Sequence, residues 1–152
     1  MAKSSNEYYS MLQISDSALE NMINDAVSSF PDECCGFMFG TEDEDVRKVR
    51  EITIVANAKE GDKRRRFQVS PVDYMKAEHY AEANGFLLLG IYHSHPNHPA
   101  IPSEHDRVAA QPYFSYVILS ILDGVYAGLR SWRLNEEALF VEETINDHQT
   151  IQ

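Results

Sequence analysis

Histidines are concentrated in one short stretch, residues 90–106, with the sequence GIYHSHPNHPAIPSEHD. Two of them, His93 and His95, end a continuous apolar run that is typical of a buried strand. Side chains two positions apart on a strand point to the same face, so both imidazoles should leave the sheet together. Pro96 ends the strand directly after them. Such a pair of imidazole nitrogens is a suitable set of ligands for zinc.

A third ligand is expected from the next element. The sequence PSEHD predicts the start of a helix, with Ser103 as its N-cap and Asp106 in its first turn. Two imidazoles and one carboxylate leave a fourth position for water, which is the arrangement of catalytic rather than structural zinc sites. A plainer interpretation stays open at this point. Single histidines are commonly packed or surface side chains, and Ser103 and Asp106 could serve only to cap the helix.

A water bound to such a metal also needs a base, and Glu33 is the candidate. It lies between Pro31 and the apolar stretch 34–40, where an exposed acid would more naturally occupy the tip of a loop. Acids are common in this chain, so the residues alone do not choose one firmly. An ordinary acid in a helix-to-strand linker is the alternative.

The length and composition suit one domain, residues 1–152, with enough apolar residues (43%) for a sizeable core. The N-terminal residues lack the apolar run of a signal peptide. No window contains the about 18–20 apolar residues of a membrane helix. We therefore expect a soluble cytoplasmic protein, with residues 146–152 as a frayed tail.

The net charge of −11 argues against a general nucleic-acid binder, which needs a basic surface for phosphates. The acidic run TEDED (residues 41–45) and the basic run KRRR (residues 63–66) are expected as solvated turns, although the basic run could contact an acidic partner. The only cysteines, Cys34 and Cys35, are adjacent, which disfavours a disulfide between them and is consistent with a reducing compartment.

The hydrophobic patterning predicts a mixed α/β fold, in which a mixed β-sheet with antiparallel hairpins is flanked by helices. One helix is expected over residues 16–30, capped by Asp16 or Ser17. A second begins at Ser70-Pro71 and ends at Asn84-Gly85. A short third helix is expected over residues 103–111. Strands are expected over residues 34–40, 46–58, 64–70, 86–95, 113–122, 126–135 and 137–145.

The candidate residues together resemble the JAMM motif, which belongs to the catalytic, MPN-plus branch of the MPN-domain metalloproteases. The motif is filled at five positions, which are Glu33, His93, His95, Ser103 after seven intervening residues, and Asp106 after two more. Stretches such as RRRFQVSPVDY, LLGIYHSHP and FSYVILSI are also similar to small bacterial JAMM proteins. The resemblance therefore covers nearly the entire chain.

The resemblance implies one zinc ion per chain, bound by His93, His95 and Asp106 with water as the fourth ligand. Glu33 would accept the proton of that water and later deliver it to the leaving amine. Ser103 would donate a hydrogen bond to the water or to the developing oxyanion. The implied MPN fold is similar to the cytidine deaminase architecture. Deaminase chemistry does not fit, because adjacent cysteines cannot supply the P-C-x-x-C ligand pair.

The resemblance further implies a zinc metallopeptidase or isopeptidase of the JAMM type. Relatives of this kind cut ubiquitin-like proteins after a C-terminal Gly-Gly. In a small bacterial protein, the implied partner is a ubiquitin-like sulfur carrier or its conjugates, with neither nucleic acid nor membrane involved. Two alternatives stay open, a non-catalytic MPN scaffold that recruits partners and a metal hydrolase of small amides. The sequence does not indicate the oligomeric state.

Several side chains near the motif have no role in this scheme. His98 and His105 are expected at the surface or behind the ligands, because the three-ligand site is already full. Cys34 and Cys35 are expected to pack in a buried strand, with a redox or inhibitory role as the alternative. Core or groove lining, rather than catalysis, is expected of Tyr92, Tyr113, Tyr116 and Trp132.

Overall fold

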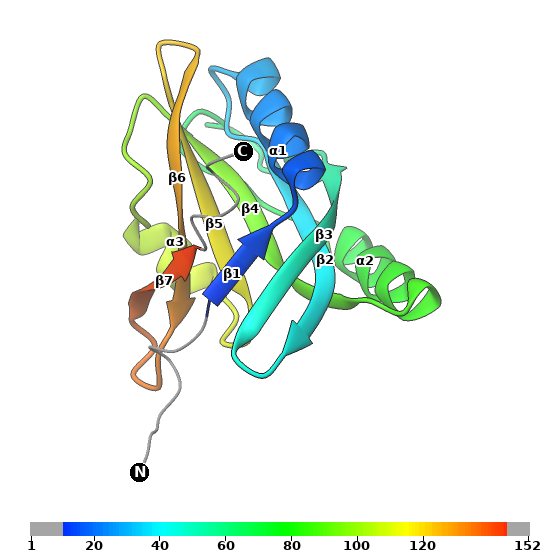
Figure 1. Ribbon diagram of the computed structural model, residues 1–152. Coiled ribbons are helices and arrows are strands. Elements are labelled where there is room, and N and C mark those ends of the chain that lie inside the picture. Colours follow the sequence, from blue (N-terminus) through cyan, green and yellow to red (C-terminus); the bar gives the residue numbers. More distant parts are fainter. Residues whose placement is uncertain (1–10, 146–152) are drawn as a thin grey trace.

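The structure is a computed structural model and describes residues 11–145. Seven strands and three helices make up that part of the chain (Figure 1). The strands are β1 (Met11–Ile14), β2 (Cys35–Asp43), β3 (Val46–Val55), β4 (Leu87–Pro96), β5 (Ser115–Leu122), β6 (Val125–Leu134) and β7 (Phe140–Ile145). The helices are α1 (Asp16–Ser29), α2 (Pro71–Asn84) and α3 (Glu104–Ala109).

The strands form one sheet, which closes into a barrel in the order β1-β3-β2-β4-β5-β6-β7. The short strand β1 closes it, because β1 pairs in parallel with β3 on one side and with β7 on the other. Figure 1 shows β1, in dark blue, between these two strands. Strand β4 lies deep in the sheet, antiparallel to β2 and parallel to β5. The histidine-bearing strand is therefore held by a ladder on both sides.

The two longer helices begin at serine caps. Ser15 Oγ accepts a hydrogen bond from the backbone N–H of Ala18, and Ser70 Oγ accepts one from Asp73. Helix α2 ends at Gly85, whose left-handed φ of 71° favours glycine. None of the helices within residues 11–145 is long and apolar enough to cross a membrane.

Two apolar clusters lie on the two faces of the sheet. The first joins α1 to residues such as Leu12, Tyr92 and Leu119, and the second joins α2 to residues such as Phe37 and Ile91. Because side chains alternate along a strand, the histidines at positions 93 and 95 share the face of Ile91. The side chain between them points to the α1 face.

The prediction of a mixed α/β fold with helices on a mixed sheet is confirmed, and most elements lie where the sequence placed them, with ends shifted by a few residues. The sheet differs in being closed. Closure depends on β1, which was not predicted because four residues are too short for periodicity to identify. Its Leu12 and Ile14 are nevertheless almost fully buried.

Three local predictions were wrong. Residues 64–70 do not form a strand, because their backbone bonds with the side chain of Asn57 instead of with a neighbouring strand. Helix α1 is capped by Ser15 rather than by Asp16 or Ser17. The loop expected over residues 41–45 is shorter, since β2 continues to Asp43. The tail expected over residues 146–152 lies outside the described residues.

Candidate metal centre

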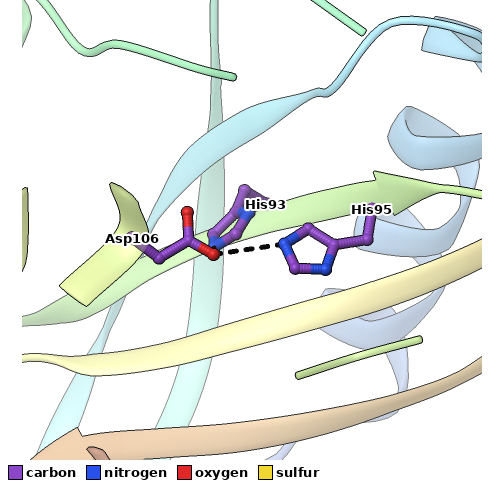
Figure 2. Close-up of side chains that lie close together, drawn as sticks. All are labelled: His93, His95 and Asp106. Atoms are coloured by element: carbon purple, nitrogen blue, oxygen red, sulfur yellow. Dashed lines mark hydrogen bonds and ion pairs between the residues drawn. The ribbon is translucent and has the colours of Figure 1, made fainter. Parts of the chain in front are cut away.

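Three side chains of the candidate set meet at the carboxyl end of β4. His93 and His95 come from β4 and Asp106 comes from α3, and Figure 2 shows them directed toward one another. One ligand atom from each lies within 4.8 Å of those of the other two. His95 Nε2 is 3.2 Å from Asp106 Oδ2, and His93 Nε2 is 4.0 Å from the same oxygen. This group contains a donor set that could hold a metal ion.

The two histidines are positioned by the sheet. His93 is paired with Cys35 of β2 on one side and with Ile118 of β5 on the other. Both imidazoles are buried, with 1% of His93 and 7% of His95 exposed. Between them, Ser94 points to the opposite face, where its Oγ accepts a hydrogen bond of 2.8 Å from the backbone N–H of Cys34. Ser94 thus ties the start of β2 to the strand that carries the histidines.

Asp106 is positioned by the start of α3. Ser103 Oγ accepts a hydrogen bond from the backbone N–H of Asp106 at 3.0 Å, and Asp106 Oδ2 accepts one from the backbone N–H of Ser103 at 2.9 Å. This reciprocal pair is a capping box with aspartate in the usual place of glutamate. The helix-capping interpretation of both residues is therefore correct, and it holds the same Asp106 oxygen against the histidines.

A hydrogen bond at the far nitrogen of His95 decides which atom faces Asp106. His95 Nδ1 lies 2.9 Å from the carbonyl oxygen of Pro99, which can only accept, so Nδ1 carries the proton. In the neutral imidazole, Nε2 then has a lone pair that faces a carboxylate oxygen. Two acceptors at this distance need a proton or a cation between them. Zinc, which binds imidazole nitrogen and carboxylate oxygen, fits this donor set.

The electrostatics favour a positive charge at the same place. Burial lowers the pKa of His95, but hydrogen bonds with Asp106 and with the Pro99 carbonyl outweigh it, and the pKa lies above its usual value. Burial raises the pKa of Asp106, but the nearby His93 charge and the hydrogen bond with His95 bring it well below the usual range. Asp106 is therefore a carboxylate at neutral pH, which is the form that binds metals.

Glu33 lies just before β2 and points at the same centre. It is 5% exposed, and its Oε1 is 3.6 Å from His93 Nδ1, which is too far for a hydrogen bond. Among the described residues, neither of these buried atoms has a hydrogen-bond partner. An unpaired buried polar atom is costly, and such atoms are a feature of functional sites. The structure therefore places Glu33 beside the three clustered side chains.

Two hollows flank the centre. The first, of about 450 Å³, is lined by His93 and Asp106 together with Phe67 and Tyr116. The second, of about 500 Å³, is lined by another part of the candidate set, namely Glu33, His95 and Ser103. The five candidate residues therefore stand between two open spaces that could receive the two sides of a substrate.

Sequence reasoning missed three contributors to the centre. Phe67 stacks on the ring of His93 with centroids 4.4 Å apart. Asn57 Nδ2 donates to the backbone carbonyl of Glu33 at 3.2 Å, and Pro99 supplies the carbonyl that orients His95. These contacts join segments distant in sequence, or use the backbone, so no local pattern indicates them. Proximity of Pro99 to the histidine pair was the only available signal.

The remaining side chains agree with their expected structural roles. Neither His98, which is exposed, nor the partly buried His105 belongs to the metal-ligand cluster found among the described residues. Both cysteines are buried free thiols. Tyr92 and Tyr116 lie in the core, while Trp132 donates to a backbone carbonyl. Tyr113 differs, since 45% of it is exposed and its ring packs against the guanidinium of Arg47.

Comparisons with known proteins extend over most of the chain. A family model described as prokaryotic homologues of the JAB domain matches residues 15–135. A desampylase of Pyrococcus furiosus is 35% identical over 111 residues, which cover 73% of this chain and 73% of that protein. A CysO-cysteine peptidase of Mycobacterium tuberculosis is 32% identical over 126 residues, covering 82% of this chain and 83% of that protein. A probable TtuB-protein conjugate cleaving protease of Thermus thermophilus is 43% identical over 63 residues, covering 41% and 42%.

Solved structures show the same fold. A protein of Desulfitobacterium hafniense superposes with a TM-score of 0.78 at 29% identity, covering 90% of this chain and 92% of that one. A JAB1/MPN domain protein of Archaeoglobus fulgidus superposes with a TM-score of 0.53 at 20% identity, covering 88% of this chain and 97% of that one. The second likeness concerns the fold alone, and it agrees with the MPN architecture expected from the sequence.

Proposed function

The chain belongs to the prokaryotic homologues of the JAB domain, and on that premise we propose that it is a zinc-dependent peptidase or isopeptidase. It hydrolyses the bond after the C-terminal Gly-Gly of a ubiquitin-like protein, and its partner is a sulfur carrier or a conjugate of one. One observation carries the proposal. His93, His95 and Asp106 gather their ligand atoms in one place, with the buried carboxylate of Glu33 next to them.

In this proposal, His93, His95 and Asp106 hold one zinc ion. When bound, the ion makes a water molecule more acidic and polarises the substrate carbonyl. The chain keeps its ligands oriented through their other contacts, since Pro99 fixes the ring of His95 and the Ser103 N–H fixes the carboxylate of Asp106. Three protein ligands leave one position open, as a catalytic site requires.

Glu33 acts as the general base and then as the general acid. Its carboxylate accepts a proton from the attacking water and later gives that proton to the nitrogen of the leaving amine. The buried Oε1 has no hydrogen-bond partner among the described residues, so its lone pairs remain available for this transfer. The backbone N–H of Glu33 donates to the carbonyl of Lys63 at 2.7 Å. This hydrogen bond fixes the backbone position from which the Glu33 side chain extends.

Ser103 stabilises the oxyanion that forms on the carbonyl oxygen of the substrate. Its Oγ already accepts a hydrogen bond from the N–H of Asp106, which engages a lone pair and leaves the hydroxyl proton for donation. The cap therefore orients the hydroxyl instead of competing with the catalytic role. Removal of an oxyanion donor of this kind lowers the rate by about 100- to 1,000-fold.

The relatives and the shape of the site support the proposed substrate class. The desampylase, the CysO-cysteine peptidase and the TtuB-protein conjugate cleaving protease are all named for protein conjugates or a protein–cysteine bond, which favours a carrier over a small amide. An extended tail can cross between the two hollows past the candidate residues. Two glycines suit a close approach to these residues, because they present no Cβ.

A non-catalytic scaffold is the alternative function. An interaction domain has no use for buried polar atoms without a hydrogen-bond partner, such as Glu33 Oε1 and His93 Nδ1, because such atoms cost free energy. The complete set of five residues therefore argues against this alternative. Purified protein that bound no zinc would favour the scaffold.

The proposal is tested by mass spectrometry of a ubiquitin-like carrier that bears a short extension after its C-terminal Gly-Gly. Zinc-loaded protein should remove the extension, and a chelator should prevent this. Glu33→Gln should keep stoichiometric zinc but lose activity by several orders of magnitude. Asp32→Asn is the matched control, because it removes the neighbouring exposed carboxylate. Full activity of Glu33→Gln would contradict the role of the base, and cleavage in chelator would contradict the metal.

A further inference from the structure

The basic run, residues 63–66, is unusual in this molecule. It is the longest run of adjacent cations in a chain with a net charge of −11, and all four side chains are exposed. Within the described residues, the run makes a single ion pair, between Arg65 and Asp62 at 3.7 Å. Exposed pairs of this kind contribute little to stability. The charge of the run is therefore not explained by the fold.

The backbone of the basic run is fixed against the candidate base. Asp62 Oδ1 accepts a hydrogen bond from the N–H of Arg64, which shapes the turn. The carbonyl of Lys63 accepts from the N–H of Glu33, and Asn57 Nδ2 donates both to the Glu33 carbonyl and to the Arg66 carbonyl. Hydrogen bonds therefore hold the backbone of the run beside Glu33, while its side chains are exposed to solvent.

The segment around the basic run borders both hollows. Lys59 and Phe67 line the first hollow, next to His93. Arg65 lines the second hollow, together with Glu33. A polypeptide that occupies either hollow therefore lies next to this segment. Whatever the exposed cations bind lies directly beside the part of the substrate that reacts.

We propose that the basic run is a docking site for an acidic segment of the polypeptide substrate, adjacent to the residues that enter the centre. The identity of the substrate as a ubiquitin-like carrier rests on the proposed function, and the inference adds that this carrier is acidic beside its tail. The rest of the chain is strongly negative and repels such a partner at long range. The basic run makes the local charge positive at the surface that the acidic segment would contact.

The test compares two labelled peptides that both end in Gly-Gly and a short extension. One has several aspartates upstream of the glycines, and the other has serines at those positions. Binding to zinc-loaded Glu33→Gln protein is measured by fluorescence anisotropy, so that the peptides stay intact. At low salt, the acidic peptide should bind about three- to tenfold more tightly, and added salt should weaken its binding.

Arg64→Ser with Arg66→Ser should remove most of this preference. Both residues use only backbone atoms in the hydrogen bonds described above, so the turn is kept. Two of the four cations, Lys63 and Arg65, remain in this variant, so added salt should weaken binding of the acidic peptide much less than it does with the intact run. Arg50→Ser with Lys76→Ser is the matched control, because it removes two exposed cations on β3 and α2 and should keep the preference.

Equal binding of the two peptides, or an equal loss in the control pair, would overturn the docking site. Because binding is measured without cleavage, the two proposals can fail separately. A preference for the acidic peptide in a protein that cleaves neither peptide would support docking and contradict the hydrolase. Cleavage of both peptides with no difference in affinity would support the hydrolase and contradict docking.

Discussion

The two halves of the candidate centre are held in different ways. His93 and His95 stand on β4, which is paired on both sides within the closed sheet. Ser103 and Asp106 stand at the start of α3, a helix of six residues, none of which is buried. Glu33 lies between these extremes, since strand β2 begins two residues after it but an irregular segment holds its backbone N–H.

This difference predicts unequal rigidity in the two halves of the centre. Ligands on a central strand keep their geometry, because the backbone hydrogen bonds with the neighbouring strands and the packing of the core already fix the backbone. A short exposed helix and a turn are held by a few hydrogen bonds and can open locally at low cost. We infer that β4 fixes the two histidine ligands more firmly than the short helix α3 fixes Ser103 and Asp106. Substitutions in the two halves should accordingly have different consequences.

The largest effect is expected from the strand half. His95→Ala should abolish tight zinc binding and therefore activity, because the remaining two side chains cannot hold the ion in a catalytic geometry. Metal analysis of purified protein after dialysis checks this. His79→Ala, on the exposed face of α2, is the control and should keep one zinc per chain. Unchanged zinc content in His95→Ala would refute the ligand set.

The next effect is expected in the helix half. Ser103→Ala should keep zinc and lower kcat by about 100- to 1,000-fold, because the oxyanion donor is lost. It should also lower the free energy of unfolding by about 1 kcal/mol, because the cap is lost. Activity assays and thermal unfolding together measure both.

Ser70→Ala separates the two roles of Ser103. Ser70 caps α2 with the same type of hydrogen bond, at 3.1 Å to the N–H of Asp73, but it does not line either hollow next to the centre. It should lose a similar amount of stability and keep its activity. If both serine variants lost activity in proportion to stability, Ser103 would be only a cap.

The sequence indicates the two halves with unequal clarity. The histidine pair follows from the period of a strand, and Ser103 and Asp106 follow from the signature of a helix start, since both patterns are local. Glu33 was ambiguous from the residues alone, and only the resemblance to the JAMM family selected it. Its position depends on Asn57, which donates to the Glu33 carbonyl, and on Ser94, which accepts from the N–H of the next residue, Cys34. Both contacts span more than 20 residues of sequence.

The errors in the predicted fold have the same origin. Residues 64–70 have the composition of a strand, but the side chain of Asn57 takes the backbone bonds that a neighbouring strand would have used. Strand β1 is too short to show periodicity and exists because two other strands lie beside it. The closed sheet could not be predicted for this reason. Contacts between separate segments of the chain decided each of these features.

A smaller effect is expected from Asn57, whose side chain joins the irregular segment to Glu33. Its amide donates to two backbone carbonyls, and its oxygen accepts from the N–H groups of Lys59 and Gln68. Asn57→Ala should lower kcat/KM by about tenfold to 100-fold through misplacement of Glu33. Trypsin should also cut the basic run faster than in the unmodified protein.

Asn57→Asp is the informative intermediate. It keeps the oxygen that accepts from Lys59 and Gln68 but loses the donor to Glu33. If the contact with Glu33 matters for catalysis, this variant should lose activity while its resistance to trypsin falls less than in Asn57→Ala. Equal activity of Asn57→Asp and the unmodified protein would mean that β2 alone positions the base.

The two cysteines next to Glu33 offer a probe that needs no substitution. Burial, with a contribution from the charge of Asp25, raises the pKa of Cys35 to about 12 and raises that of Cys34 as well. Thiols with such pKa values stay protonated and unreactive at neutral pH. Iodoacetamide at mildly alkaline pH should therefore modify the native protein at least about a hundredfold more slowly than the unfolded protein.

This last measurement tests whether Glu33 belongs with the strand half of the centre. The reaction requires both an ionised thiol and an opening of β2 away from β4, since Cys34 is tied to Ser94 by its backbone N–H and carbonyl. Slow modification would mean that the start of β2 opens as rarely as the core does. Rapid modification of Cys34 in folded, zinc-loaded protein would mean that Glu33 sits on a segment as easily opened as α3. In that case only the two histidines would belong to the rigid strand half of the centre, and Glu33 would belong with the less firmly held residues of α3.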